Sequence, residues 1–174
     1  MSEETLDSTF NKCLAKACMG AGSSCCCKGQ IFLPNNELES IRTWLSTRSE
    51  SERENFERCV VSHDGFALLN QENRCQFLDD KNLCRLHNEG VKPTECFWWP
   101  LHVYLNNRNQ LEIRISEDCC GAHTCLNCDA AAATETEVLK IETKARLMGL
   151  DLIRQFRQVY QGSYVCRPMR VISE

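Results

Sequence analysis

The sequence predicts an α+β fold in a single domain that spans residues 1–174. Apolar residues recur at helical spacing near both ends of the chain, and short runs of strand-like sequence occupy the middle. The 14 cysteines are bunched, with three consecutive at Cys25, Cys26 and Cys27 and four within residues 119–128. Hydrophobic residues make up 43% of the chain and charged residues 25%, which is ordinary for a globular protein and sufficient for a core.

Helix-capping signals organise the N-terminal part of the chain. Asn35 or Asn36 is positioned to cap a helix, and Ser51-x-x-Glu54 matches a capping box. A short apolar run that ends at Pro34 has the composition of a strand. These signals, with the apolar spacing, predict helices over residues 3–18, about 35–47 and about 51–59, and a strand over 31–34.

Alternation marks the strands of the middle part. Leu111, Ile113 and Ile115 alternate with polar residues and face a similar run across the polar turn at 106–110. A weaker hairpin is predicted around the turn at 79–82. The predicted strands are residues 66–69, 76–78, 83–87, 101–105 and 111–115.

The C-terminal part is predicted to form one long helix over residues 134–161. Its apolar residues follow a spacing of three and four that places them on one buried stripe. Gly149 lies inside this pattern and weakens the helix by about 1 kcal/mol relative to alanine. The predicted architecture is therefore a small cysteine-rich core with short hairpins, flanked by N-terminal helices and this helix.

Charge and hydropathy exclude several classes of partner. The formal net charge is −4 and the basic residues are scattered, so no nucleic-acid surface is expected. No window approaches 18 uncharged apolar residues, so no membrane partner is expected. The N-terminal residues lack the basic and apolar regions of a signal peptide, which predicts a cytoplasmic location. Thiols stay reduced there, so the bunched cysteines favour metal binding over disulfides.

The cysteine spacing bears on the kind of metal. Four thiolates hold either zinc or an iron–sulfur cluster. Cys25, Cys26 and Cys27 are consecutive, and neighbouring side chains point in different directions, which favours a polynuclear site; alternatively, only two of the three are ligands. Cys120-x4-Cys125-x2-Cys128 matches part of the plant-type [2Fe–2S] spacing, although His123 makes a mixed zinc site equally constructible.

Other residues near the cysteines allow two interpretations each. The spacing of Cys84 and His87 suits zinc, but a lone histidine is more often a surface or core residue. The Trp98-Trp99 pair either shields a metal site or fills the core. The carboxylates nearest the cysteines are acid/base candidates or, more commonly, solvated surface groups: Glu95, Glu117 and Asp118.

Several blocks together resemble the YkgJ-type cysteine-cluster family, described as zinc- or iron-chelating domains. The resemblance starts with cysteines ending in Cys26-Cys27, followed by the apolar strand and an acidic helix from about Glu37. It continues with Cys75-Gln-Phe-Leu78, Cys84, and Cys96 before Phe-Trp-Trp-Pro100. A cysteine after the following hairpin, Cys119 or Cys120, is also family-like, so the resemblance covers about residues 18–121. The same blocks are distantly similar to the flagellin lysine-N-methylases, which links them to an iron–sulfur centre.

The resemblance implies a cysteine-cluster metal-binding core over residues 18–128. It implies ligand roles for Cys26, Cys27, Cys75, Cys84 and Cys96, with Cys18, Cys25 and Cys119 or Cys120 as additions. Cys125 and Cys128 exceed the family pattern and suggest a second or enlarged site. Cys13, Cys59 and Cys166 are the expected spare thiols.

The leading functional hypothesis is a protein with one or more iron–sulfur clusters and a redox or cluster-dependent enzymatic role. An enzymatic role rests on the family resemblance alone, because the sequence has no phosphate loop, zincin helix or nucleophile elbow. No catalytic residue is assigned, and the substrate is an unknown small molecule or protein. The alternatives are a zinc-stabilised protein-interaction module and a metal carrier or store.

Overall fold

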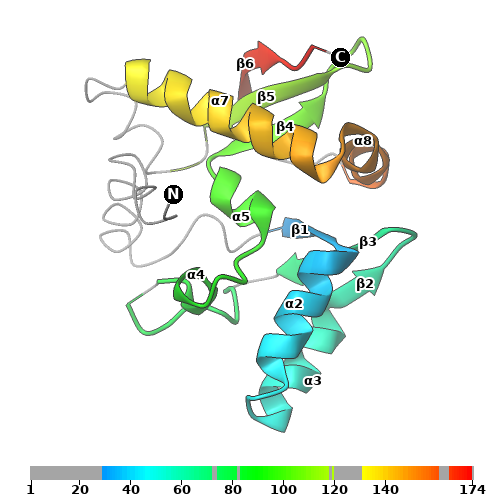
Figure 1. Cartoon of the computed structure of the whole chain (residues 1–174), viewed down its shortest axis with the longest axis vertical. Helices are drawn as coiled ribbons and strands as arrows, with labels where there is room; N and C mark the ends of the chain where they lie inside the picture. The colour runs from blue at the N-terminus through cyan, green and yellow to red at the C-terminus, as the bar shows by residue number, and fades with distance from the viewer. Residues whose placement is uncertain are drawn as a thin grey trace.

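The computed structural model describes residues 29–71, 74–81, 83–117, 119, 131–160 and 165–173. In this part of the chain it has six helices and two small three-stranded antiparallel sheets, which confirms the α+β class (Figure 1). In chain order the elements are β1 (Gly29–Pro34), α2 (Asn35–Leu45), α3 (Glu50–Cys59), β2 (Val60–Ser62), β3 (Phe66–Gln71), α4 (Arg85–Asn88), α5 (Thr94–Trp98), β4 (Leu101–Leu105), β5 (Leu111–Ser116), α7 (Ala131–Met148), α8 (Leu150–Val159) and β6 (Cys166–Val171).

The first sheet has the order β1-β3-β2 and packs against α2 and α3. Successive side chains of a strand point to opposite faces. Alternate residues of β1 and β3 therefore join α2 and α3 in a first hydrophobic cluster, while Phe32, Phe66 and Leu68 face a second. The buried members of the first cluster are Ile31, Leu33, Leu38, Ile41, Leu45, Phe56, Ala67, Leu69, Phe77 and Leu86.

The second sheet has the order β4-β5-β6 and is covered by α7 and α8 (Figure 1). Its inward residues and those helices form the second hydrophobic cluster, which also contains Phe32 of β1. The Phe32 ring stacks on Phe156 of α8, with centroids 4.5 Å apart. The short helix α5 lies between the two sheets and contacts both β1 and β4.

The strands predicted over 31–34, 66–69, 101–105 and 111–115 are confirmed as β1, β3, β4 and β5. The capping residues of the first two described helices differ from the predicted ones. The capping box of α3 is formed by Ser49 and Glu52, two residues before the predicted pair. Helix α2 follows Pro34 and has no side-chain cap, so the capping role predicted for Asn35 or Asn36 is wrong. The predicted helix over residues 3–18 lies outside the described residues.

The weaker hairpin is wrong in part. Around the turn at 79–82 only one isolated bridge forms, between Leu78 and Cys84, and residues 85–88 are the helical turn α4 instead of a strand. Asp79 explains the tight loop, because its carboxylate accepts hydrogen bonds from the backbone N–H groups of Lys81 and Leu83, at 2.8 and 2.9 Å. Such local side-chain bonds compete with strand pairing.

The single long C-terminal helix is also wrong, because Gly149 divides it into α7 and α8. Gly149 has φ of 103° and ψ of 113°, a backbone conformation that ends α7 and turns the chain into α8. The turn lets α8 present Ile153, Phe156 and Arg157 to the interior. The apolar spacing over 134–161 is therefore produced by two helices that pack on one cluster.

Replacing Gly149 with alanine is expected to destabilise the protein by about 1–3 kcal/mol, because an L-residue is strained at this φ. An added Cβ would meet nothing within 4 Å, so the loss of stability would come from backbone strain alone and not from a steric clash. Gly90→Ala is the matched control, since its φ of 70° is left-handed and its surroundings are equally open. Urea unfolding should give a smaller loss for Gly90→Ala, and equal stability of Gly149→Ala and wild type would contradict the argument.

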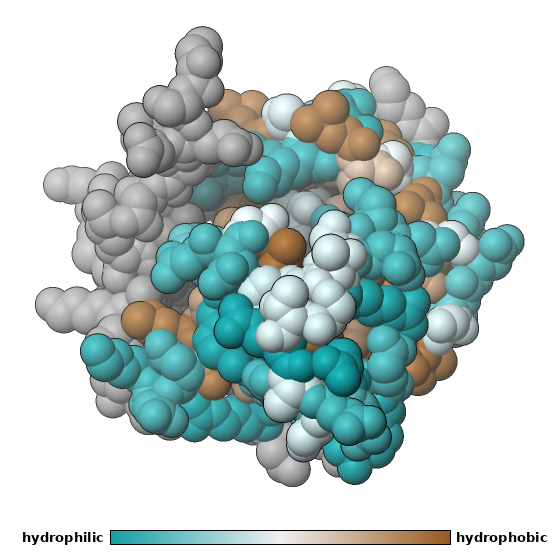
Figure 2. Space-filling model, turned by 60° about the horizontal axis from the view of Figure 1, so that its bottom comes forward, coloured by the Kyte–Doolittle hydropathy of each residue, from teal (hydrophilic) through white to brown (hydrophobic). Residues whose placement is uncertain are grey.

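The end of the molecule formed by α2 and α3 is mostly hydrophilic. Figure 2 shows this end from below, with hydrophilic residues over most of the described surface and apolar residues in separate patches. Some of the exposed charges of α2 and α3 are paired, as in Arg42, which binds both Glu39 and Glu57 at 2.8 Å. Among the described residues, no helix is both long and apolar enough to cross a membrane.

Candidate metal centre

Cys75, Cys84 and Cys96 come from separate segments and lie against the same hydrophobic cluster. Cys75 follows β3, Cys84 precedes α4, and Cys96 lies within α5. All are partly buried and pack against the first cluster. Cys84 and Cys96 carry free thiols. The fold therefore brings thiols from three different segments to one hydrophobic cluster.

Local geometry brings Cys75 and Cys84 to the same loop. The backbone N–H of Leu78 donates to the carbonyl of Cys75 at 3.2 Å, and Leu78 forms the bridge with Cys84. The N–H of Arg85 donates to the carbonyl of Phe77 at 2.8 Å, which closes the loop. The buried ring of Phe77 anchors it in the first cluster.

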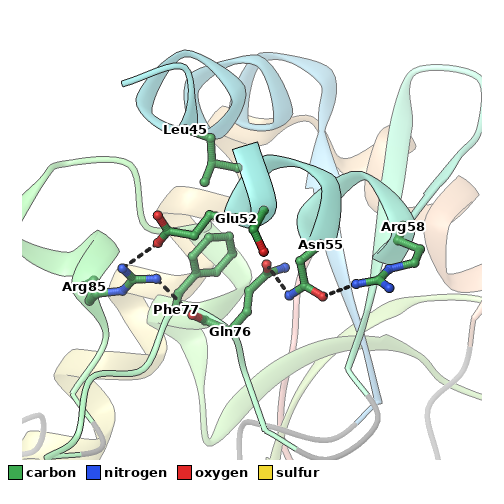
Figure 3. Close-up of a pocket in the computed structure, with 8 residues that line it drawn as sticks. Leu45, Glu52, Asn55, Arg58, Gln76, Phe77 and Arg85 are labelled. Atoms are coloured by element: carbon green, nitrogen blue, oxygen red, sulfur yellow. Dashed lines mark hydrogen bonds and ion pairs between the residues drawn. The ribbon is translucent and has the colours of Figure 1, made fainter. Parts of the chain in front are cut away.

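Helix α3 supports this loop through polar contacts across an open cleft of ≈ 200 Å³ (Figure 3). Arg85 binds Glu52 at 2.8 Å and donates to the carbonyl of Gln76 at 3.1 Å. Asn55 donates to the Gln76 side chain at 2.9 Å. Gln76 and Arg85 directly follow Cys75 and Cys84 in the sequence. The cleft is thus lined by groups that hold the loop on α3.

The electrostatics of these thiols favour a bound cation. Burial raises the pKa of Cys96 well above its ordinary range, and the charges of Cys75 and Cys84 raise it further, while Lys92 lowers it. The Cys96 thiol therefore resists ionising in the absence of a cation. A metal ion stabilises thiolates, and thiolate sulfur suits zinc and iron–sulfur clusters. The donor set thus fits the metals that the sequence predicts.

A complete site needs ligands beyond these thiols. Within the described residues, no group of three or more histidine, cysteine, aspartate or glutamate side chains is arranged to hold a metal ion by itself. Cys119 is fully buried in the second cluster, whereas Cys75, Cys84 and Cys96 pack against the first. The remaining predicted ligands lie outside the described residues: Cys18, Cys25, Cys26, Cys27, Cys120, Cys125 and Cys128.

The described cysteines that are expected not to bind metal, Cys59 and Cys166, lie on other elements than the candidate ligands. Cys59 ends α3, carries a free thiol and packs against the first cluster. Cys166 begins β6, where its Sγ lies 3.8 Å from the hydroxyl of Tyr104. Cys13 lies outside the described residues.

Glu95 is a buried ion-pair residue, so the expectation of a solvated carboxylate is wrong for it. Its Oε1 lies 2.8 Å from Arg157 Nη2 and 3.5 Å from His102 Nδ1, and its Oε2 accepts from the N–H of Phe32 at 2.6 Å. Burial favours the protonated acid, but Arg157 and His102 outweigh burial and lower the pKa of Glu95. Burial lowers the pKa of His102, which keeps its imidazole neutral. Glu95 thus holds the fold together and is poorly placed for proton transfer.

The other described residues that flank the cysteines lie in the core or at the surface. Trp98 is buried in the second cluster, and His87 is exposed with its ring 5.8 Å from Phe97. Glu117 is exposed, and Asp118 and His123 lie outside the described residues. The ammonium groups of Lys92 and Lys144 lie 4.8 and 4.5 Å from the centre of the Phe97 ring.

Sequence reasoning missed Arg157, because its partner Glu95 is 62 residues away along the chain. The only signal in the sequence is an arginine that falls on the apolar side of the C-terminal helical pattern. That position is usually read as the edge of the buried stripe, since arginine is rarely buried without a partner.

A family model described as CxxCxxCC, a putative zinc- or iron-chelating domain, matches residues 16–121. This match covers more than half of the chain and includes β1 through β5, with Cys75, Cys84 and Cys96. No curated protein and no solved structure matches the chain. The chain therefore belongs to the CxxCxxCC family of zinc- or iron-chelating domains.

Proposed function

We propose that this protein holds an iron–sulfur cluster through its cysteine blocks and serves a redox or cluster-dependent enzymatic role. The observation that carries the proposal is the gathering of Cys75, Cys84 and Cys96 on one hydrophobic cluster, where burial and the charges of Cys75 and Cys84 raise the pKa of Cys96. Membership of a zinc- or iron-chelating family supports metal binding by these residues. A cluster bound there supplies one-electron chemistry.

The proposed ligand set combines thiols of three blocks. Cys75, Cys84 and Cys96 supply the described part, and the other two blocks supply the rest. The preference for iron over zinc rests on the consecutive cysteines, whereas the sulfur donors of the described part suit both metals. Soft thiolates select zinc, copper(I) and iron–sulfur clusters over the hard cations that prefer carboxylates. The other proposed ligands are Cys18, Cys25, Cys26, Cys27, Cys119, Cys120, Cys125 and Cys128.

The surroundings of the thiols suit a redox role better than acid/base chemistry. Glu95, which is adjacent to Cys96, has both carboxylate oxygens engaged in the interior. The first cluster provides an apolar backing that limits solvent access on one side of the thiols, and such surroundings tune a bound cluster. A small-molecule or protein substrate would then approach from the opposite side, and the proposed location is the cytoplasm, where thiols remain reduced.

Anaerobic purification tests the proposal directly. We expect a brown protein with iron and acid-labile sulfide in stoichiometric amounts, because thiolate-bound clusters absorb in the visible range. Metal analysis and sulfide analysis on the same sample distinguish the alternatives. A colourless protein with tightly bound zinc, and no cluster after incubation with iron and sulfide, would replace the proposal with a zinc-stabilised interaction module. A protein whose thiols are mostly in disulfides would contradict metal binding altogether.

A further inference from the structure

The helix that carries Cys96 has little means of holding its own orientation. Helix α5 has only five residues, and its N-cap position is Pro93, which provides no side-chain cap. Short helices are unstable without tertiary contacts. The orientation of α5, and with it the direction of the Cys96 thiol, therefore depends on contacts made by its neighbouring residues.

Glu95 provides the most strongly constrained of these contacts. Its side chain is only 5% exposed. One oxygen accepts the backbone N–H of Phe32 in β1, and the other binds Arg157 in α8. These contacts attach α5 to the first sheet and to the C-terminal helix. Because Glu95 and Cys96 are consecutive, a rotation of α5 that moved the thiol would break at least one of these bonds.

Arg157 is itself held rigidly. Its side chain is 2% exposed, and its Nε donates to the carbonyl of Val103 in β4 at 2.6 Å. The guanidinium group lies 4.4 Å from the centre of the Tyr104 ring and 4.2 Å from that of Phe156. An arginine fixed on both faces and at its edge presents its Nη2 to Glu95 in a single geometry. Through Arg157 and Glu95, α5 is therefore held in a fixed position relative to β4 and α8.

We infer that Arg157 is a positioning residue for the metal centre, acting through Glu95 to orient the Cys96 thiol. Arg157 lies outside residues 16–121, the part matched by the family model. Helix α8 thus helps to position the metal centre, although none of the proposed ligands lies on α8. The inference rests on the proposed function, because it assumes that Cys96 binds metal.

The test compares Arg157→Met with Arg154→Met in the anaerobically purified, metal-containing full chain. Arg154 lies on the same helix and pairs with Asp151 near the surface, so it controls for the loss of one positive charge. We expect metal transfer from Arg157→Met to a chelator to be about 10–100-fold faster than from wild type, as for other residues that orient ligands. Arg154→Met should match wild type.

Site-resolved alkylation during metal release separates positioning from general destabilisation. Cys96 of Arg157→Met should react well before Cys75 and Cys84, and Arg157→Lys should recover part of the wild-type rate because it keeps the charge beside Glu95. Equal acceleration at all these thiols, or a wild-type release rate, would overturn the inference while leaving metal binding intact. A metal-free wild type would instead refute the proposed function and the inference with it. Should Arg157→Met fail to fold, Glu95→Gln gives the same readout.

Discussion

Replacing Cys84 with serine is expected to remove the bound metal and to unfold much of the region around the first cluster. Cys84 joins the 78–84 loop to α4, and its side chain packs against the first cluster. Serine is a poor ligand for a site built from thiolates. The free energy of binding structural zinc is about 10–16 kcal/mol in small metal-dependent domains, so loss of one ligand costs several kcal/mol of folding free energy. Metal content per chain and near-ultraviolet circular dichroism measure the two losses.

Cys59→Ser is the matched control for this variant. Cys59 is also a partly buried free thiol on the first cluster, but it lies at the end of α3 and is an expected spare. It should keep its full metal content and lose only about 1 kcal/mol of stability, as an average substitution does. Wild-type metal content in Cys84→Ser would remove Cys84 from the ligand set. If Cys59→Ser lost as much metal as Cys84→Ser, the loss would result from changing any thiol in this core and would not identify Cys84 as a ligand.

The strands that could be predicted from the sequence are those with a buried face. Residues 111–116 alternate cleanly because Leu111, Ile113 and Ile115 all enter the second cluster. The edge strand β6 was missed because its residues are mostly exposed and include Pro168, which is tolerated at a sheet edge. Its pairing depends on β5, which supplies the hydrogen-bonding edge from a distant part of the chain.

The candidate site can also be predicted only where the signal is local in the sequence. The spacing of Cys75, Cys84 and Cys96 is local, and their grouping was predicted from it together with the family resemblance. The structure places these thiols on one hydrophobic cluster, and their role as ligands stays a prediction. The burial of Glu95 could not be predicted in this way, because a carboxylate is expected in solvent unless its partner is known. That partner is 62 residues away on α8, and only the packed fold brings the two together.

The two hydrophobic clusters raise the question whether the chain unfolds as one unit, as expected for a single domain. Phe32 connects them, because β1 belongs to the first sheet while the Phe32 ring stacks on Phe156 and meets Phe66 edge-on at 5.4 Å. Phe56 is equally buried but lies only in the first cluster. Phe32→Ala therefore tests the connection between the two clusters, and Phe56→Ala tests the first cluster alone.

Phe32→Ala is expected to destabilise the whole metal-loaded protein by about 3–5 kcal/mol, since it leaves a cavity between the sheets. The far-ultraviolet circular dichroism and fluorescence transitions in urea should stay coincident and shift together, as for a single cooperative unit. Phe56→Ala should shift the same single transition by a similar amount, although its side chain does not touch the second cluster. Separate transitions in Phe56→Ala, with the second sheet still folded when the first has melted, would show two independent units. In that case Phe32 would contribute to a contact between units, and the Glu95–Arg157 pair would join two parts that each fold alone.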